Sequence, residues 1–228
     1  MSTQSTDRTP ERQASRFQLT GRGQVGAGNM EAAFARNRAF AAAGGHEGAV
    51  VIPQLGLFVI TCLDPRVDPA HFLGLELSDA MVVRNVGGRV TQAVINDVAY
   101  ISQITENVLP DGPLFEVAVI HHTQCGAAAL ADDAFRHRYA ERIGADESGL
   151  RELAVLDPAA TVASDVERLR SDPSISTRIG VAGYVYDVLT GVIETIVPAG
   201  APAVQSNHQS ESPKEDQSHG HNRPPAQI

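Results

Sequence analysis

The protein has 228 residues, of which 43% are hydrophobic, so it can bury one substantial core and is expected to form a single domain. Lysine and arginine together number 18 and aspartate and glutamate 27, which gives a formal net charge of −9 at pH 7. An acidic body repels nucleic acids and anionic membrane surfaces, so we expect neither as a partner.

No stretch of the sequence has the length of a membrane-spanning helix, and the polar residues 1–16 lack the apolar segment of a secretory signal. We therefore expect a soluble, cytoplasmic protein. The sequence contains only two cysteines, Cys62 and Cys125. A cytosolic setting keeps thiols reduced, which leaves both cysteines free for chemistry.

Composition separates the two ends of the chain from its centre. We assign residues 1–27 to a partly disordered N-terminal extension, 28–200 to the folded domain, and 201–228 to a disordered tail rich in Ser, Pro, Gln and His. A G-x-G-x-x-G match at 21–26 has no strand before it, so we interpret it as a flexible loop rather than a dinucleotide site. The tail histidines are interpreted as solvated: His208, His219 and His221.

The spacing of apolar residues and the positions of glycine and proline predict the elements of the domain. The first expected element is a helix over 29–45, with Asn29 as N-cap and Gly44 near its end. A strand over 56–61, a helical turn after Pro69 and a strand over 80–85 follow, and then a helix from Thr91 that stops at Pro110. The second half is expected to form a strand over 115–122, helices over 126–144 and 159–171, and two strands joined at Thr190 and Gly191.

Strands that alternate with helices in this way indicate an α/β fold. The central sheet is expected to be mostly parallel and flanked by helices, because crossover helices connect parallel strands. The last two predicted strands are separated by a short turn, so a closing antiparallel strand or hairpin is expected.

Three chemically active side chains follow the first predicted strand: Cys62, Asp64 and Arg66. Packing gives no reason for a thiol, a carboxylate and a guanidinium to gather at the end of a buried strand. The third predicted strand ends similarly, in the sequence "IHHTQCG", where His122 precedes Cys125 by three residues. If both strands are parallel in one sheet, the two cysteines emerge at the same edge, where open α/β sheets place their sites.

Two cysteines and one histidine suit tetrahedral zinc, and three protein ligands leave a fourth position for water, as in catalytic sites. The competing interpretation is two buried cysteines and a hydrogen-bonded core histidine. His121 and His122 point to opposite faces of a strand, and spacing alone does not choose between them. The small residues Gly126, Ala127 and Ala128 leave the backbone after Cys125 open to a small ligand.

The neighbouring Asp64 and Arg66 allow three interpretations. Arg66 can keep Asp64 ionised and oriented, so that the carboxylate accepts a proton from a water beside the metal. Asp64 can instead bind the metal and close the site, which would give a non-enzymatic zinc or redox protein. The two residues can also form a weak surface ion pair.

These motifs resemble those of the β-class carbonic anhydrases. The family signature, C-x-D-x-R followed about sixty residues later by H-x-x-C-G, is matched by residues 62–66 and 122–126, and the resemblance covers approximately residues 28–197. The resemblance implies zinc held by Cys62, His122 and Cys125, a catalytic dyad of Asp64 and Arg66, and a dimer or larger homo-oligomer.

The activity implied is reversible hydration of carbon dioxide to bicarbonate by attack of zinc-bound hydroxide. Asp64 would accept the hydroxide proton, and the backbone N–H of Gly126 would bind the developing bicarbonate oxygen. Carbonyl sulfide and carbon disulfide hydrolases share this fold and zinc signature, so hydrolysis of those substrates at the same site is the alternative.

Overall fold

A computed structural model describes residues 29–201 of the chain. The expectations for residues 1–28 and 202–228 lie outside the described residues. They include the glycine motif at 21–26 and the tail histidines His208, His219 and His221.

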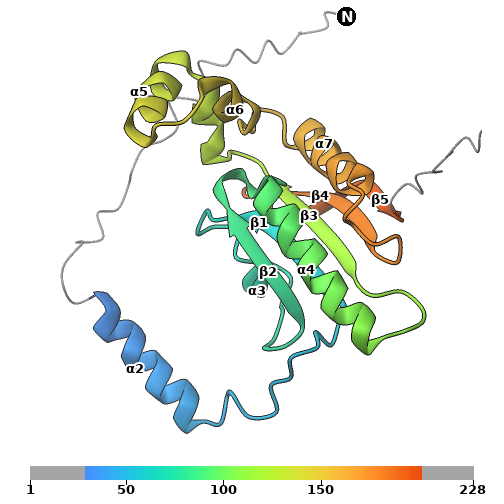
Figure 1. Cartoon of the computed structure of the whole chain (residues 1–228). Helices are drawn as coiled ribbons and strands as arrows, with labels where there is room; N and C mark the ends of the chain where they lie inside the picture. The colour runs from blue at the N-terminus through green and yellow to red at the C-terminus, as the bar shows by residue number, and fades with distance from the viewer. Residues whose placement is uncertain (1–28, 202–228) are drawn as a thin grey trace, which may run out of the picture.

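The centre of the molecule is a five-stranded sheet with strand order β2-β1-β3-β4-β5 (Figure 1). The first four strands run parallel to their neighbours and β5 closes the sheet antiparallel to β4. The predicted α/β fold with a mostly parallel sheet and a closing hairpin is therefore confirmed. The strands are β1 (Leu57–Cys62), β2 (Ala80–Asn85), β3 (Glu116–His122), β4 (Gly180–Tyr186) and β5 (Ile193–Gly200).

Helices cover both faces of the sheet. Apolar side chains of α4 and α7 pack on the face formed by Phe58, Ile60 and Val119, while residues in and after α3 pack on the opposite face against Val59 and Ile120. Alternate residues of each strand thus enter opposite cores, as the pleat requires. The α-helices are α2 (Asn29–Ala42), α3 (Pro69–Phe72), α4 (Gln92–Val108), α5 (Asp133–Ile143), α6 (Glu147–Glu152) and α7 (Pro158–Ser171), and the 3-10 helices are η1 (Val86–Gly88) and η2 (Gly126–Ala131).

The single helix predicted over 126–144 is wrong. The structure has the 3-10 helix η2, a break at Asp132, and then α5. Asp132 has extended backbone angles (φ −74°, ψ 121°), and its side chain accepts a hydrogen bond from the Phe135 N–H at 2.7 Å. This carboxylate caps the start of α5, so the local hydrogen bond of an aspartate interrupts the helix that the apolar spacing predicted.

Helix α2 lies apart from the sheet (Figure 1). Its large apolar side chains remain exposed, with Met30 at 59%, Phe34 at 49% and Phe40 at 45% of their full accessible area. Between residues 29 and 201, no helix is long and apolar enough to cross a membrane.

Candidate metal centre

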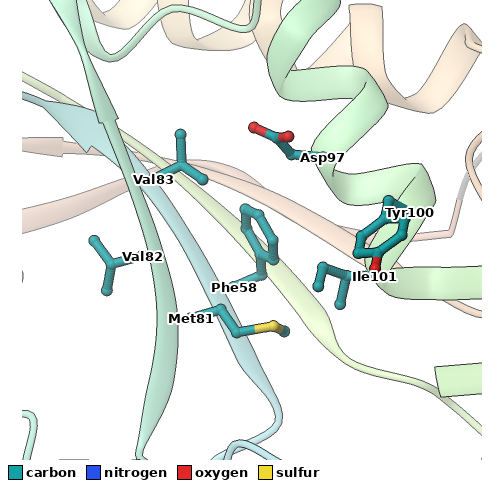
Figure 2. Close-up of a pocket in the computed structure, with 7 residues that line it drawn as sticks. All are labelled: Phe58, Met81, Val82, Val83, Asp97, Tyr100 and Ile101. Atoms are coloured by element: carbon teal, nitrogen blue, oxygen red, sulfur yellow. The ribbon is translucent and has the colours of Figure 1, made fainter. Parts of the chain in front are cut away.

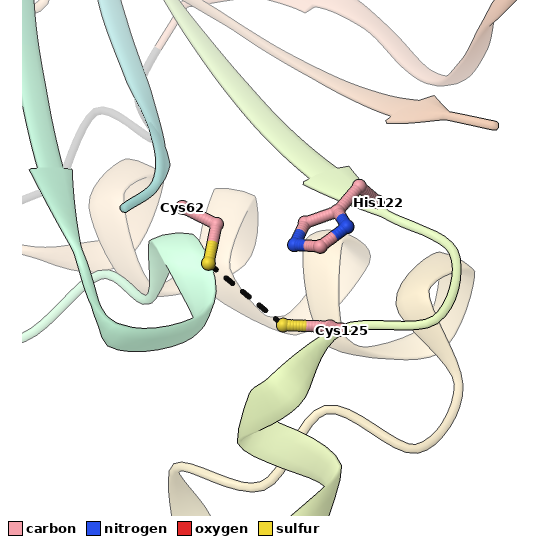
Figure 3. A group of neighbouring side chains, drawn as sticks. All are labelled: Cys62, His122 and Cys125. Carbon is pink, nitrogen blue, oxygen red and sulfur yellow. Dashed lines mark hydrogen bonds between the residues drawn. The ribbon is translucent and has the colours of Figure 1, made fainter. Parts of the chain in front are cut away.

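The carboxyl ends of β1 and β3 bring Cys62, His122 and Cys125 together, although Cys62 is 60 residues from His122 and 63 from Cys125 (Figure 3). The parallel pairing of these neighbouring strands places both ends at one edge of the sheet. The ligand atoms of all three residues lie within 4.8 Å of one another, and all three residues are buried. Within residues 29–201, this is the only group of three or more such side chains close enough to hold one metal ion.

The spacing of the two sulfur atoms fits a tetrahedral metal. The Sγ atoms of Cys62 and Cys125 are 3.9 Å apart, and both cysteines are free thiols rather than a disulfide. Two sulfurs each about 2.3 Å from a tetrahedral zinc ion are separated by about 3.8 Å. The donor set of two sulfurs and one imidazole is also the one that zinc prefers.

His122 presents an unused lone pair to this group. Its Nδ1 lies 2.9 Å from the carbonyl oxygen of Thr123, which can only accept, so Nδ1 carries the proton. In the neutral imidazole Nε2 then carries the lone pair, and among the described residues this buried atom has no hydrogen-bond partner. A backbone carbonyl that fixes the tautomer in this way is typical of metal-binding histidines. The neighbouring His121 is held elsewhere by Thr161 and Asp165, so the structure separates the two histidines that strand spacing left unresolved.

The two cysteine side chains lie close enough to shift each other's pKa. A hydrogen bond from Cys125 outweighs the effect of burial and, with the His122 side chain and the backbone N–H groups of Asp64 and Gly87, lowers the pKa of Cys62 to about 4. The same interaction with Cys62, followed by burial, raises the pKa of Cys125 because a second adjacent negative charge is unfavourable. A cation that binds both sulfurs would offset this repulsion between thiolates, because metal binding favours the deprotonated ligand.

Asp64 and Arg66 form a two-point ion pair beside the three candidate ligands. Arg66 donates from Nε to Asp64 Oδ1 at 3.0 Å and from Nη2 to Oδ2 at 2.6 Å, and its backbone N–H also donates to Oδ1 at 2.9 Å. These hydrogen bonds, opposed by partial burial, lower the pKa of Asp64. Arg66 also donates to the Gln124 carbonyl at 3.0 Å, which joins the loop after Cys62 to the loop before Cys125. Asp64 is thus held beside the three candidate ligands and is not one of them.

The turn η1, which packs against the backbone at the metal centre, was not predicted from the sequence. The side chain of Asn85 closes this turn through hydrogen bonds to the N–H and C=O of Arg89. Gly88 adopts a left-handed conformation (φ +67°), and a Cβ atom there would lie 2.9 Å from the backbone N of Cys62. The signal was present in the sequence as Gly87-Gly88 directly after a strand, because paired glycines mark a turn or a close backbone approach.

Gly88→Ala is expected to weaken metal binding, because the added methyl group must push the turn away from the Cys62 backbone. We expect about tenfold weaker zinc affinity in a competition titration with a chelator. Gly112→Ala is the matched control, since Gly112 has a similar backbone angle (φ +80°) with nothing within 4 Å of an added Cβ. Equal zinc affinities for the two variants would show that the close approach of Gly88 does not support the metal centre.

Apolar side chains surround the candidate metal centre. Cys62 and Cys125 pack with Val67, Ala127 and Val155, and Phe72, Tyr186 and Val188 lie against this cluster. Gly126 begins η2 immediately after Cys125 and is half-buried. The three donor atoms at this edge of the sheet therefore lie within an apolar cluster, with the carboxylate of Asp64 beside them.

Comparison with known proteins places this site within a family. The family model described as carbonic anhydrase matches residues 57–193. The chain is 29% identical over 161 residues to β-carbonic anhydrase 1 of Mycobacterium tuberculosis, covering 68% of this chain and 91% of that protein. It is also 29% identical over 157 residues to the carbon disulfide hydrolase of an Acidianus species, covering 59% of this chain and 74% of that protein.

The solved structures agree with this assignment. The structure of a carbonic anhydrase from Streptococcus mutans superposes with a TM-score of 0.62 at 30% sequence identity, covering 73% of this chain and 96% of that chain. The family match spans all three candidate metal ligands and most of the described sheet. The chain therefore belongs to the β-carbonic anhydrase family.

Proposed function

We propose that this protein holds zinc through Cys62, His122 and Cys125 and catalyses the reversible hydration of carbon dioxide to bicarbonate. The observation that carries this proposal is the buried, unpartnered Nε2 of His122 beside two sulfurs at tetrahedral spacing. Three protein ligands leave one coordination position for the reaction. When bound, zinc lowers the pKa of a coordinated water from about 15.7 towards neutrality and so supplies a nucleophile at physiological pH.

Asp64 orients the attacking water in this proposal. Oδ1 of Asp64 already accepts two hydrogen bonds from Arg66 and Oδ2 accepts one, so Oδ2 retains a free lone pair. The lowered pKa of Asp64 keeps this oxygen an acceptor at neutral pH. Oδ2 can therefore accept a hydrogen bond from the O–H of the attacking hydroxide, which would turn the lone pair of that oxygen towards the carbon of the substrate.

The surrounding chain suits a small apolar substrate. The apolar cluster around the cysteines favours carbon dioxide, which has no charge to desolvate, and excludes competing water. The backbone N–H of Gly126 is proposed to donate to the oxygen that becomes negative as bicarbonate forms. The product is charged and leaves this apolar space readily.

Hydrolysis of carbonyl sulfide or carbon disulfide is the second candidate, because carbon disulfide hydrolases occur among the relatives at the same 29% identity as a carbonic anhydrase. The two functions are separated by giving one zinc-loaded preparation all three substrates and measuring kcat/KM for each. We expect carbon dioxide to be preferred. Sulfide release from carbon disulfide that is faster than carbon dioxide hydration would replace the proposed function with the alternative.

We also propose that the protein acts as a homodimer in which α2 of one copy packs on the other. A hollow of about 250 Å³ lies between the edge strand β2 and α4 (Figure 2). Its lining is almost entirely apolar, and the exposed apolar side chains of α2 have no partner on their own sheet among the described residues. In a dimer, α2 of each copy would cover the hollow of the other copy, so that both apolar surfaces would be buried. The lining residues are Phe58, Met81, Val82, Val83, Asp97, Tyr100 and Ile101.

Phe34→Glu is expected to weaken this dimer, because the substitution places a charge in the apolar contact. We expect a dissociation constant at least about 100-fold higher by sedimentation equilibrium, as for loss of a buried aromatic anchor. Ala35→Glu adds the same charge to a neighbouring face of α2 and is expected to leave the dimer intact. A monomeric wild-type chain would contradict the dimer, and so would equal dissociation constants for the two variants.

The cytoplasm is the proposed compartment. The metal centre requires Cys62 and Cys125 as thiolates, and both are free thiols whose sulfurs lie 3.9 Å apart. An oxidising compartment favours linking two thiols that lie this close, whereas the cytosol keeps them available to metal.

A further inference from the structure

A buried group of polar and charged side chains lies near the metal centre and has no part in the chemistry described above. Asp165 of α7 is 1% exposed, His121 of β3 is fully buried, and Arg89, which follows η1, is 8% exposed. These residues come from three elements that are far apart in the sequence. Buried charges are costly unless they are paired, so the arrangement calls for a specific account.

The carboxylate of Asp165 is the centre of this group. Arg89 donates to it through both Nε, at 2.7 Å, and Nη2, at 3.0 Å, and the backbone N–H of Val90 donates at 3.1 Å. His121 Nε2 lies 3.2 Å from the same carboxylate and 3.2 Å from the Gly88 carbonyl; both partners are acceptors, so Nε2 donates. Burial favours the protonated acid, but the hydrogen bonds from His121 and Arg89 outweigh it and lower the pKa of Asp165.

The outer contacts of the group extend to further segments. Nη1 of Arg89 donates to the carbonyl oxygen of Glu152 at the end of α6, and Nδ1 of His121 lies 2.9 Å from the Thr161 hydroxyl of α7. One carboxylate therefore connects the η1 turn, β3 and α7, and through Arg89 it also reaches the end of α6. Salt bridges of this kind hold segments in one arrangement even when they add little net stability.

Two of the connected segments touch the candidate metal ligands. The η1 turn packs against the backbone of Cys62, since a Cβ atom at Gly88 would lie 2.9 Å from the Cys62 backbone N. His121 directly precedes His122 at the end of β3. Movement of the carboxylate would thus be transmitted to Cys62 through the turn and to His122 through the strand.

We propose that Asp165 is a positioning residue that fixes the geometry of the metal centre through Arg89 and His121. The inference rests on the proposed function in taking Cys62, His122 and Cys125 as the metal ligands. Without the carboxylate, the Arg89 side chain loses the partner that aligns it. The segment that follows η1 also loses the hydrogen bond donated by the Val90 N–H. The ligands then hold the metal less tightly, while the sheet that carries them remains folded.

The test compares zinc release from full-length zinc-loaded wild-type protein, Asp165→Asn and Leu169→Ala. Leu169 lies one helical turn further along α7, is fully buried in the main core and does not contact the metal centre, so it controls for loss of stability. Zinc release is followed as transfer to a chromogenic chelator, and the absorption spectrum of the cobalt(II)-substituted protein reports the coordination geometry. We expect about tenfold faster release and an altered cobalt spectrum in Asp165→Asn alone.

Arg89→Lys provides a second variant should Asp165→Asn fail to fold, since it keeps the charge but loses the two-point contact, and it is expected to release zinc faster as well. Release at the rate of Leu169→Ala, with a wild-type cobalt spectrum, would overturn the inference and leave the proposed function intact. Zinc retention by a wild-type protein that does not hydrate carbon dioxide would overturn only the proposed function. A wild-type protein that binds no zinc would overturn both.

Discussion

Cys62→Ser is expected to lose both bound zinc and carbon dioxide hydration. A neutral hydroxyl is a far poorer ligand for zinc than a thiolate, and the two remaining ligands, His122 and Cys125, do not make a complete site. We expect the zinc content to fall from about one ion per chain to nearly none, and the rate of hydration to fall by a factor on the order of 10³ or more. Metal analysis and stopped-flow hydration assays on the same preparation check both.

The matched control is Thr61→Ser at the preceding residue of β1. Thr61 is fully buried, and serine keeps the hydroxyl that donates to the Ile120 carbonyl at 2.9 Å. This variant tests whether a small change at the strand end disturbs the site without removing a ligand. Full zinc content and activity in Cys62→Ser would exclude the thiolate as a ligand, and loss of zinc in Thr61→Ser would show that the assay reports general disruption.

Asp64→Asn is expected to keep its zinc and lose most of its activity. The amide can still occupy the position beside Arg66, but an NH₂ group in place of Oδ2 cannot accept the hydrogen bond that orients the attacking oxygen. Loss of a hydrogen bond that positions the attacking oxygen is expected to reduce the rate by about 10²-fold. Measurement of kcat together with zinc content separates this effect from loss of metal.

The pH dependence of that variant supplies an independent check. Arg66 lowers the pKa of Asp64, so the folded wild-type protein keeps this carboxylate ionised throughout the neutral and alkaline range. The ratio of wild-type to Asp64→Asn rates should therefore be constant between about pH 7 and pH 9, well above the ordinary aspartate pKa. A ratio that falls towards 1 as the pH decreases would show that Asp64 titrates in this range and is not held by Arg66.

Local patterns were sufficient to predict the part of the fold that carries the metal ligands. The run ending at Cys62 and the run ending at His122 form β1 and β3, and their parallel pairing brings both cysteines to one edge as expected. Apolar runs bounded by turn signals are local features, and the edge at which parallel strands end is a general property of α/β sheets. The choice between His121 and His122 as the candidate ligand needed the resemblance or the structure, because it depends on which groups each imidazole ring contacts in the fold.

Contacts between distant segments could not be predicted in the same way. Arg89 and Asp165 are separated by 76 residues, and nothing near either of them in the sequence identifies the other. A partial signal exists in α7, where Asp165 follows Val162 by three residues and precedes Leu169 by four, on the face that enters the core. A carboxylate on the apolar face of a helix predicts a buried partner, but only the folded structure, which brings α7 to the segment after η1, shows which one it is.

Stopped-flow hydration of carbon dioxide by the zinc-loaded wild-type protein tests the central claim most directly. With Cys62, His122 and Cys125 holding zinc beside an oriented Asp64, the rate should exceed the buffer rate by several orders of magnitude, and removal of the zinc by a chelator should return it to that level. A rate at the level of buffer, in protein shown to carry about one zinc ion per chain, would contradict the account.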